Sequence, residues 1–113
     1  MTLTADDLFQ HCVDTISSIL QKHDADDFFY IGVTETPKNR FNNREIGHWR
    51  RFGKMYLVGV SGNVRIVRDV KERLISEWRS LDSNCTNKGK GGERVGVRAD
   101  IARFIYLVTG SMS

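Results

Sequence analysis

The sequence predicts an α+β fold in which a small sheet of about three strands is flanked by about three helices. Two observations predict this class. Segments with apolar residues at helical spacing alternate with shorter β-prone segments, in the order α-β-α-β-α-β. The composition, with 40% hydrophobic residues, 27% charged residues and a single proline, is typical of a packed globular protein. A length of 113 residues fits one domain spanning residues 1–113.

The first element is predicted to be an amphipathic helix over residues 4–23. Thr4, followed three places later by Asp7, has the pattern of a helix N-cap. Apolar residues then recur at spacings of three and four, as expected for one buried helix face. These residues are Leu8, Phe9, Cys12, Val13, Ile16, Ile19 and Leu20.

A strand is predicted over residues 28–34, between an acidic loop at residues 24–27 and a turn at Pro37. The next segment, residues 39–51, is polar with a few apolar anchors, and it predicts a short helix interrupted at Gly47.

The second half of the chain predicts two further strands around a longer helix. Residues 54–61 are β-rich, and Gly62-Asn63 breaks this strand before a helix that extends to about Leu81. The apolar seam of that helix consists of Val67, Val70, Leu74, Ile75 and Trp78. A glycine-rich basic loop over residues 85–96 then leads to a final strand at residues 104–108.

The charge distribution predicts a polyanionic partner, although solvated surface is the alternative explanation. The net charge is +3, and six aspartates precede the first strand, so the chain after Lys38 is much more basic. Cys12 and Cys85 have no metal-ligand spacing and suggest no disulfide scaffold. The chain has no secretory signal pattern and no run of about eighteen apolar residues, so we expect a cytoplasmic protein without a membrane span.

Several short motifs, in this order and spacing, resemble the GIY-YIG nuclease superfamily. They are Tyr30-Ile31-Gly32, Arg40 eight positions beyond Gly32, the helical pair Leu74-Ile75, and Asn87 before a glycine run. The resemblance implies a small, mostly antiparallel sheet, to which the helix over residues 4–23 would be an addition. It also implies that Tyr30 acts near the attacking water, that Arg40 steadies the phosphate, and that a glutamate holds Mg²⁺ or Mn²⁺.

Two positions depart from the family pattern. Counting back three residues from Leu74 leads to Lys71 instead of the family's glutamate, and a protonated lysine cannot bind a cation. The neighbouring Glu72 is therefore either a rearranged metal ligand or a surface charge. The family's first motif strand is also missing before Tyr30. The last strand could fill that place, with Tyr106 acting as a catalytic tyrosine in a permuted motif, or Tyr106 could be a core aromatic residue.

Further residues are candidates for contacts with nucleic acid. Gly32 would permit close approach of the substrate to the backbone. Arg40, Arg44 and His48 recur every four residues, which on one helix gives a basic face, or else a solvated surface. Asn87 matches a family position, and Lys88 and Lys90 lie in a glycine-rich loop that could wrap phosphates or be ordinary surface.

Three functions remain open from the sequence. The favoured hypothesis is a nucleic-acid-binding domain of GIY-YIG endonuclease type with an impaired or rearranged catalytic site. The first alternative is an active Mg²⁺- or Mn²⁺-dependent endonuclease that uses Tyr30 or Tyr106, Arg40 and Glu72. The second alternative is a module that binds a protein or a nucleotide without catalysis.

Overall fold

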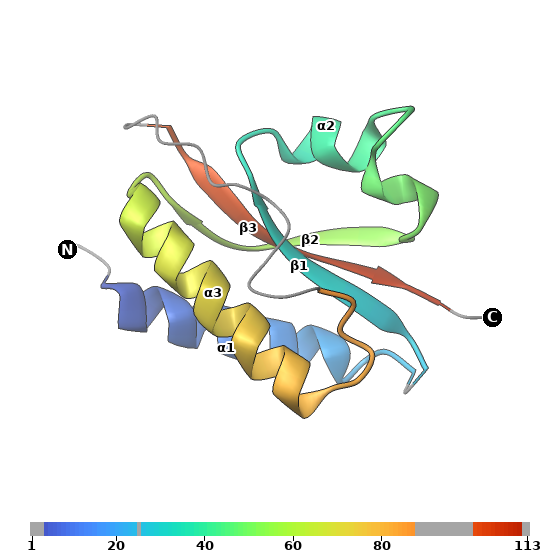
Figure 1. The fold of residues 1–113 in the computed structure, drawn as a ribbon, viewed down its shortest axis with the longest axis horizontal. Helices are drawn as coiled ribbons and strands as arrows, with labels where there is room; N and C mark the ends of the chain where they lie inside the picture. The colour runs from blue at the N-terminus through green and yellow to red at the C-terminus, as the bar shows by residue number, and fades with distance from the viewer. Residues whose placement is uncertain (1–3, 25, 88–100, 112–113) are drawn as a thin grey trace.

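The computed structural model describes residues 4–24, 26–87 and 101–111 (Figure 1). Along the chain, the described elements are α1 (Ala5–Leu20), β1 (Phe28–Thr34), α2 (Pro37–Asn42), the 3₁₀ helix η1 (His48–Arg50), β2 (Lys54–Ser61), α3 (Val64–Leu81) and β3 (Arg103–Gly110). The predicted α+β class is confirmed: these elements form a three-stranded antiparallel sheet flanked by helices.

The strand β3 lies in the centre of the sheet, although it comes last in the sequence. The strand order is β1-β3-β2, and β3 pairs antiparallel with both neighbours (Figure 1). Five of its eight residues are β-branched or aromatic, and seven of its eight positions are buried, as expected for a strand covered on both faces. The first strand in the chain therefore acquires its sheet partner from the other end of the described chain.

The two faces of the sheet have different covers. Side chains alternate between faces along each strand, so Phe29, Ile31, Ile105 and Leu107 face α1 and α3 and belong to the main hydrophobic core. Tyr106 and Val108 face the opposite side, where they pack in a smaller cluster with Phe52. In Figure 1, α1 and α3 lie on one side of the sheet and α2 on the other.

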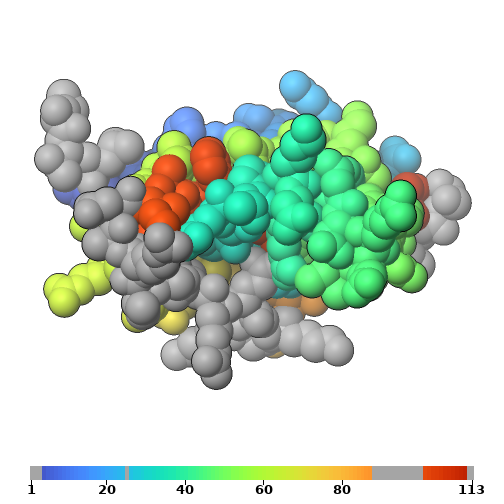
Figure 2. Space-filling model, turned by 90° about the horizontal axis from the view of Figure 1, so that it is seen from above, coloured from blue at the N-terminus to red at the C-terminus, as the bar shows by residue number. Residues whose placement is uncertain are grey.

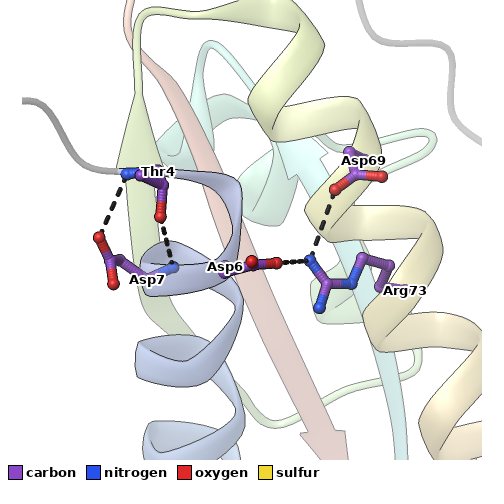
Figure 3. A network of polar contacts seen from close by, with 5 residues as sticks. All are labelled: Thr4, Asp6, Asp7, Asp69 and Arg73. Carbon is purple, nitrogen blue, oxygen red and sulfur yellow. Dashed lines mark hydrogen bonds and ion pairs between the residues drawn. The ribbon is translucent and has the colours of Figure 1, made fainter.

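The helix α1 begins where the sequence predicts, because Thr4 and Asp7 cap its first turn with two reciprocal hydrogen bonds. The Thr4 hydroxyl accepts a hydrogen bond from the Asp7 amide, and the Asp7 carboxylate accepts one from the Thr4 amide (Figure 3). Arg73 of α3 reaches Asp6 at 2.8 Å and Asp69 at 3.6 Å, and its guanidinium carbon lies 4.1 Å from the centre of the Phe9 ring. The hydrogen bond that Arg73 donates to the Asp6 carboxylate raises the pKa of Arg73, so the guanidinium that links the two helices stays charged.

The helix α3 also follows its sequence pattern. Asn63 caps it by accepting hydrogen bonds from the amides of Arg65 and Ile66. All five residues of the predicted seam are buried: Val67, Val70, Leu74, Ile75 and Trp78. The helix ends at Leu81, as predicted.

The helix predicted over residues 39–51 is wrong in its second half. The helix α2 ends at Asn42, because the side chain of Asn43 accepts hydrogen bonds from the amides of Glu45 and Ile46 and builds a turn instead. Gly47 then lies so close to this turn that an added Cβ would meet the Asn43 carbonyl oxygen at 2.5 Å. The chain resumes as the short helix η1, so Arg40, Arg44 and His48 do not share one helix face.

A close approach between α1 and β2 fixes the packing of the first helix on the sheet. Cys12 is fully buried, and its thiol donates a hydrogen bond to the Val58 carbonyl oxygen at 3.6 Å. Burial raises the pKa of the Cys12 thiol to about 12, which keeps it protonated and able to donate. The neighbouring Gly59 leaves room for this sulfur, because a Cβ at Gly59 would lie 2.7 Å from it.

We expect Gly59→Ala to lower the free energy of unfolding by about 1–3 kcal/mol, because the added methyl group must displace a fully packed sulfur. Gly62→Ala is the matched control: nothing lies within 4 Å of its added Cβ, so we expect a change within about 0.5 kcal/mol. Urea denaturation of both variants measures the difference. Equal stabilities would show that α1 and β2 are not held this closely.

Candidate nucleic-acid interface

Three ring side chains from distant parts of the chain meet on the sheet face opposite α1 and α3. Tyr30 comes from β1, His48 from η1 and Tyr106 from β3. The ring centres of Tyr30 and His48 are 5.3 Å apart, those of His48 and Tyr106 are 5.3 Å apart, and those of Tyr30 and Tyr106 are 6.4 Å apart. His48 Nε2 and the Tyr106 hydroxyl form a hydrogen bond of 2.6 Å.

The sheet register explains why Tyr106 reaches this position. It pairs with Gly32 of β1, which has no side chain to occupy the same face of the sheet. Tyr30 lies two pairs further along, opposite Val108, so the two tyrosines are diagonal neighbours on one face of the sheet. The sequence left open whether the last strand lies beside the Tyr30 strand, and the pairing of β3 with β1 shows that it does. Tyr106 is fully buried, which agrees with the alternative that it is a core aromatic residue, whereas Tyr30 and His48 are half-buried.

A cavity of about 410 Å³ opens beside Tyr30, and we call it the tyrosine cavity. Its lining includes Tyr30, His48, Arg50, Arg51, Phe52 and Thr86. The Phe52 ring lies 6.4 Å from that of Tyr30 and 5.6 Å from that of His48, so aromatic rings form its floor. No Asp or Glu is among the described residues that line it.

Positive charge is concentrated in the polypeptide that covers this face. Residues 37–54, which we call the basic segment, contain six Lys and Arg residues and one Glu, a net charge of +5. Figure 2 views the molecule from this side, with the segment in cyan and green in the foreground. On the other side of the sheet, α1 contains three Asp residues and no Lys or Arg. The helix α3 on that side has five Lys and Arg residues against three Asp and Glu residues, so α1 and α3 together sum to −1. Positive charge is thus concentrated on the face covered by the basic segment, as expected of a surface that attracts polyanions.

The predicted phosphate-binding arginines lie in this segment but outside the tyrosine cavity. Arg40 is half-buried on α2, on the same side of the sheet as Tyr30, and does not line the described part of the cavity. Arg44 is exposed in the turn after α2, where its carbonyl oxygen accepts a hydrogen bond from Arg50 Nη1 at 3.0 Å. Of the three residues expected to share a basic helix face, only His48 lines the cavity.

Asn87 has a structural position that the sequence did not suggest. Its side-chain oxygen accepts a hydrogen bond from the Ile31 amide at 2.9 Å, and its side-chain nitrogen donates to the Ile31 carbonyl oxygen at 2.8 Å. The backbone carbonyl of Asn84 accepts a hydrogen bond from the Phe29 amide, and both the amide and the hydroxyl of Thr86 donate to the Phe29 carbonyl oxygen. Residues 84–87 therefore cover the outer edge of β1 and hold the Tyr30 strand in place, with Asn87 only 5% exposed.

Glu72, the predicted metal ligand, lies apart from the tyrosines. It is exposed on α3 and lines a different, larger cavity of about 660 Å³ together with Asp69, Arg73, Glu77 and Arg79. Lys71, its neighbour, faces the core and is 6% exposed. The described residues that line the cavity beside Tyr30 include no carboxylate, and nowhere in the described residues do three His, Cys, Asp or Glu side chains gather as metal ligands. This donor set does not fit Mg²⁺ or Mn²⁺, which prefer carboxylate oxygens.

Two predicted residues, Lys88 and Lys90, lie outside the described residues. Conversely, the structure adds residues that sequence reasoning missed as cavity residues, namely Phe52 and Thr86. A local pattern could have indicated Phe52, because the run from His48 to Phe52 alternates aromatic and cationic side chains, as nucleic-acid-binding surfaces do. Thr86 carries no such indication, since only the sheet-edge hydrogen bonds bring it near Tyr30.

No protein-family model matches the chain, and no curated protein or solved structure is significantly similar to it. Among the described helices, none combines the length and apolar character needed to cross a bilayer. Only the geometry and charge of the site therefore bear on function.

We expect Asn87→Ala to destabilise the fold by about 1–3 kcal/mol for each Ile31 backbone group that it leaves buried without a partner. The exposed Asn39→Ala on α2 is the control, with an expected change within about 0.5 kcal/mol. Urea denaturation gives both values, and amide hydrogen exchange at Ile31 should become faster in the first variant only. If Ile31 keeps its protection after Asn87→Ala, the side chain does not hold this strand edge.

Proposed function

We propose that this protein binds the phosphate backbone of nucleic acids through its basic segment, as a domain of GIY-YIG type with an altered catalytic site. One observation carries the proposal: the net charge of +5 in residues 37–54 lies on the sheet face that also bears Tyr30, His48 and the tyrosine cavity. Cations clustered beside aromatic rings are the usual composition of a surface that binds nucleic acid with little sequence preference.

The arrangement of the tyrosines supports the kinship part of the proposal. In the permuted version of the family motif, the last strand would supply the tyrosine that the first motif strand supplies in the family. Tyr106 lies on β3, antiparallel to the strand of Tyr30, with the two rings 6.4 Å apart. The lysine at the aligned metal position and the outward direction of Glu72 support the view that the catalytic site is altered.

Binding should depend strongly on salt, because each neutralised phosphate releases counterions. With labelled single-stranded and duplex DNA and RNA, we expect the affinity to fall at least about tenfold between about 50 and 200 mM salt. Replacing both Arg50 and Arg51 by Gln should reduce the slope of log affinity against log salt by about one unit per arginine lost. Fluorescence anisotropy measures both quantities.

The control for that experiment is the double variant Arg65→Gln and Arg68→Gln. It removes the same charge from exposed positions on α3, on the other side of the sheet, and should leave the slope nearly unchanged. An affinity that is insensitive to salt, or equal losses in both double variants, would contradict the proposal.

A second candidate function is endonuclease activity, and the hydrogen bond of 2.6 Å between His48 Nε2 and the Tyr106 hydroxyl favours it. An imidazole held in place by a phenol can accept a proton from an adjacent water and thereby activate that water, which is what phosphodiester hydrolysis requires. Under the altered-site proposal, however, the protein should leave DNA intact.

We therefore expect no cleavage of supercoiled plasmid or branched DNA by the purified protein, with Mg²⁺, with Mn²⁺ or with chelator. Cleavage by the wild-type protein that is lost on His48→Ala would establish the second candidate instead. Glu72→Gln, tested in parallel, would reveal whether that carboxylate takes part in any activity observed. Agarose gels before and after incubation give the result.

A further inference from the structure

We propose that the tyrosine cavity receives one unpaired nucleotide of the bound nucleic acid, with its base against the aromatic rings and its phosphate at the arginines. This inference rests on the proposed function, because it names the part of a nucleic acid that the same face selects. A cavity of about 410 Å³ lies within the usual range for sites that enclose a small organic group. A paired base within a duplex could not enter it, whereas an extrahelical or single-stranded base could.

The aromatic floor is suited to a base. The rings of Tyr30 and His48 are inclined at 41°, and those of His48 and Phe52 at 76°, so the three rings are mutually tilted and form a concave surface. A planar base placed there would lie against the face of one ring while another ring meets it edge-on. Stacking of this kind is favourable for every base, because each base has a π-face.

The arginines are placed where the phosphate of such a nucleotide would emerge. The guanidinium carbon of Arg51 lies 5.7 Å from the centre of the Phe52 ring, so a permanent positive charge borders the aromatic floor. Arg50 lies beside it, held in place by the hydrogen bond from its Nη1 to the Arg44 carbonyl oxygen. Guanidinium groups present several N–H donors in one plane and bind phosphate oxygens in pairs.

The remaining lining residues complete the match. The Thr86 hydroxyl donates a hydrogen bond to the Phe29 carbonyl oxygen at 2.9 Å, so its oxygen retains lone pairs that can accept an N–H from the edge of a base. Ile46 is 69% exposed at the cavity and offers apolar surface to cover the outer face of the base. Because none of the described lining residues is acidic, nothing in this lining repels a phosphate.

The decisive experiment compares two DNA hairpins of equal charge. One carries a single bulged nucleotide, and the other carries an abasic sugar-phosphate at the same position, so only the base differs. By fluorescence anisotropy at fixed salt, we expect the wild-type protein to bind the bulged hairpin about tenfold more tightly than the abasic one. A fully paired hairpin should bind no better than the abasic one.

Variants separate the base from the phosphate. Phe52→Leu and Tyr30→Leu, each checked for a native circular-dichroism spectrum, should bring the ratio of the two affinities close to one. Arg51→Gln should weaken binding to both hairpins and to the duplex. The bulged hairpin should still bind more tightly than the abasic one. Arg68→Gln, on the other side of the sheet, should change neither quantity.

A measurement without variants covers the case in which those proteins do not fold. Titration with a 5′-mononucleotide should shift the amide resonances of Gly47, Phe52 and Thr86 more than inorganic phosphate does at equal ionic strength, because only the nucleotide brings a base to the rings. Equal affinity of the wild-type protein for the bulged and abasic hairpins would overturn this inference. If that binding were still salt-dependent, the proposed function would stand. If no hairpin binds at all, both fail together.

Discussion

The pairing of β3 between β1 and β2 is the constraint on which the rest of the structure depends. Because β3 is the central strand, it supplies apolar side chains to both faces of the sheet at once. Its odd-numbered residues Ile105 and Leu107 complete the core beneath α1 and α3, while Tyr106 and Val108 complete the cluster on the other face. A shift of one residue in this register would exchange the two sets, burying the Tyr106 hydroxyl in the aliphatic core.

The same register also builds the candidate site. Tyr106 is opposite Gly32, and the space above that glycine allows the tyrosine ring to lie next to Tyr30 and to hydrogen-bond to His48. Asn87 holds the far edge of β1 by bonding to both backbone groups of Ile31. The strand of Tyr30 is thus held on both sides, by its pairing with the central strand β3 and by the Asn87 hydrogen bonds at its outer edge. Rigid support of this kind is what a recognition surface requires.

The sequence predicted the regular elements well, since each has a local cause. The boundaries of β1, β2 and α3 follow from β-rich runs and from the Asn63 cap, and all three agree with the structure. The helix prediction was wrong for the segment after α2, because the side chain of Asn43 stabilises a turn there. The site was predicted in part: Tyr30 and His48 reach the cavity, whereas Thr86 is brought there by hydrogen bonds at the sheet edge that no local pattern encodes.

The position aligned with the family's glutamate shows how a one-residue offset on a helix changes the chemistry of a site. Successive residues on α3 are about 100° apart, so Lys71 packs inward at 6% exposure while Glu72 is exposed on the helix surface. The carboxylate is thereby directed away from the tyrosines, and the face that bears them keeps its positive character. Under the proposed function, the net charge of +5 in residues 37–54 would draw a polyanion to this face of the sheet. The tyrosine cavity opens on the same face, so its aromatic rings and guanidinium groups would then decide which part of the polyanion is held.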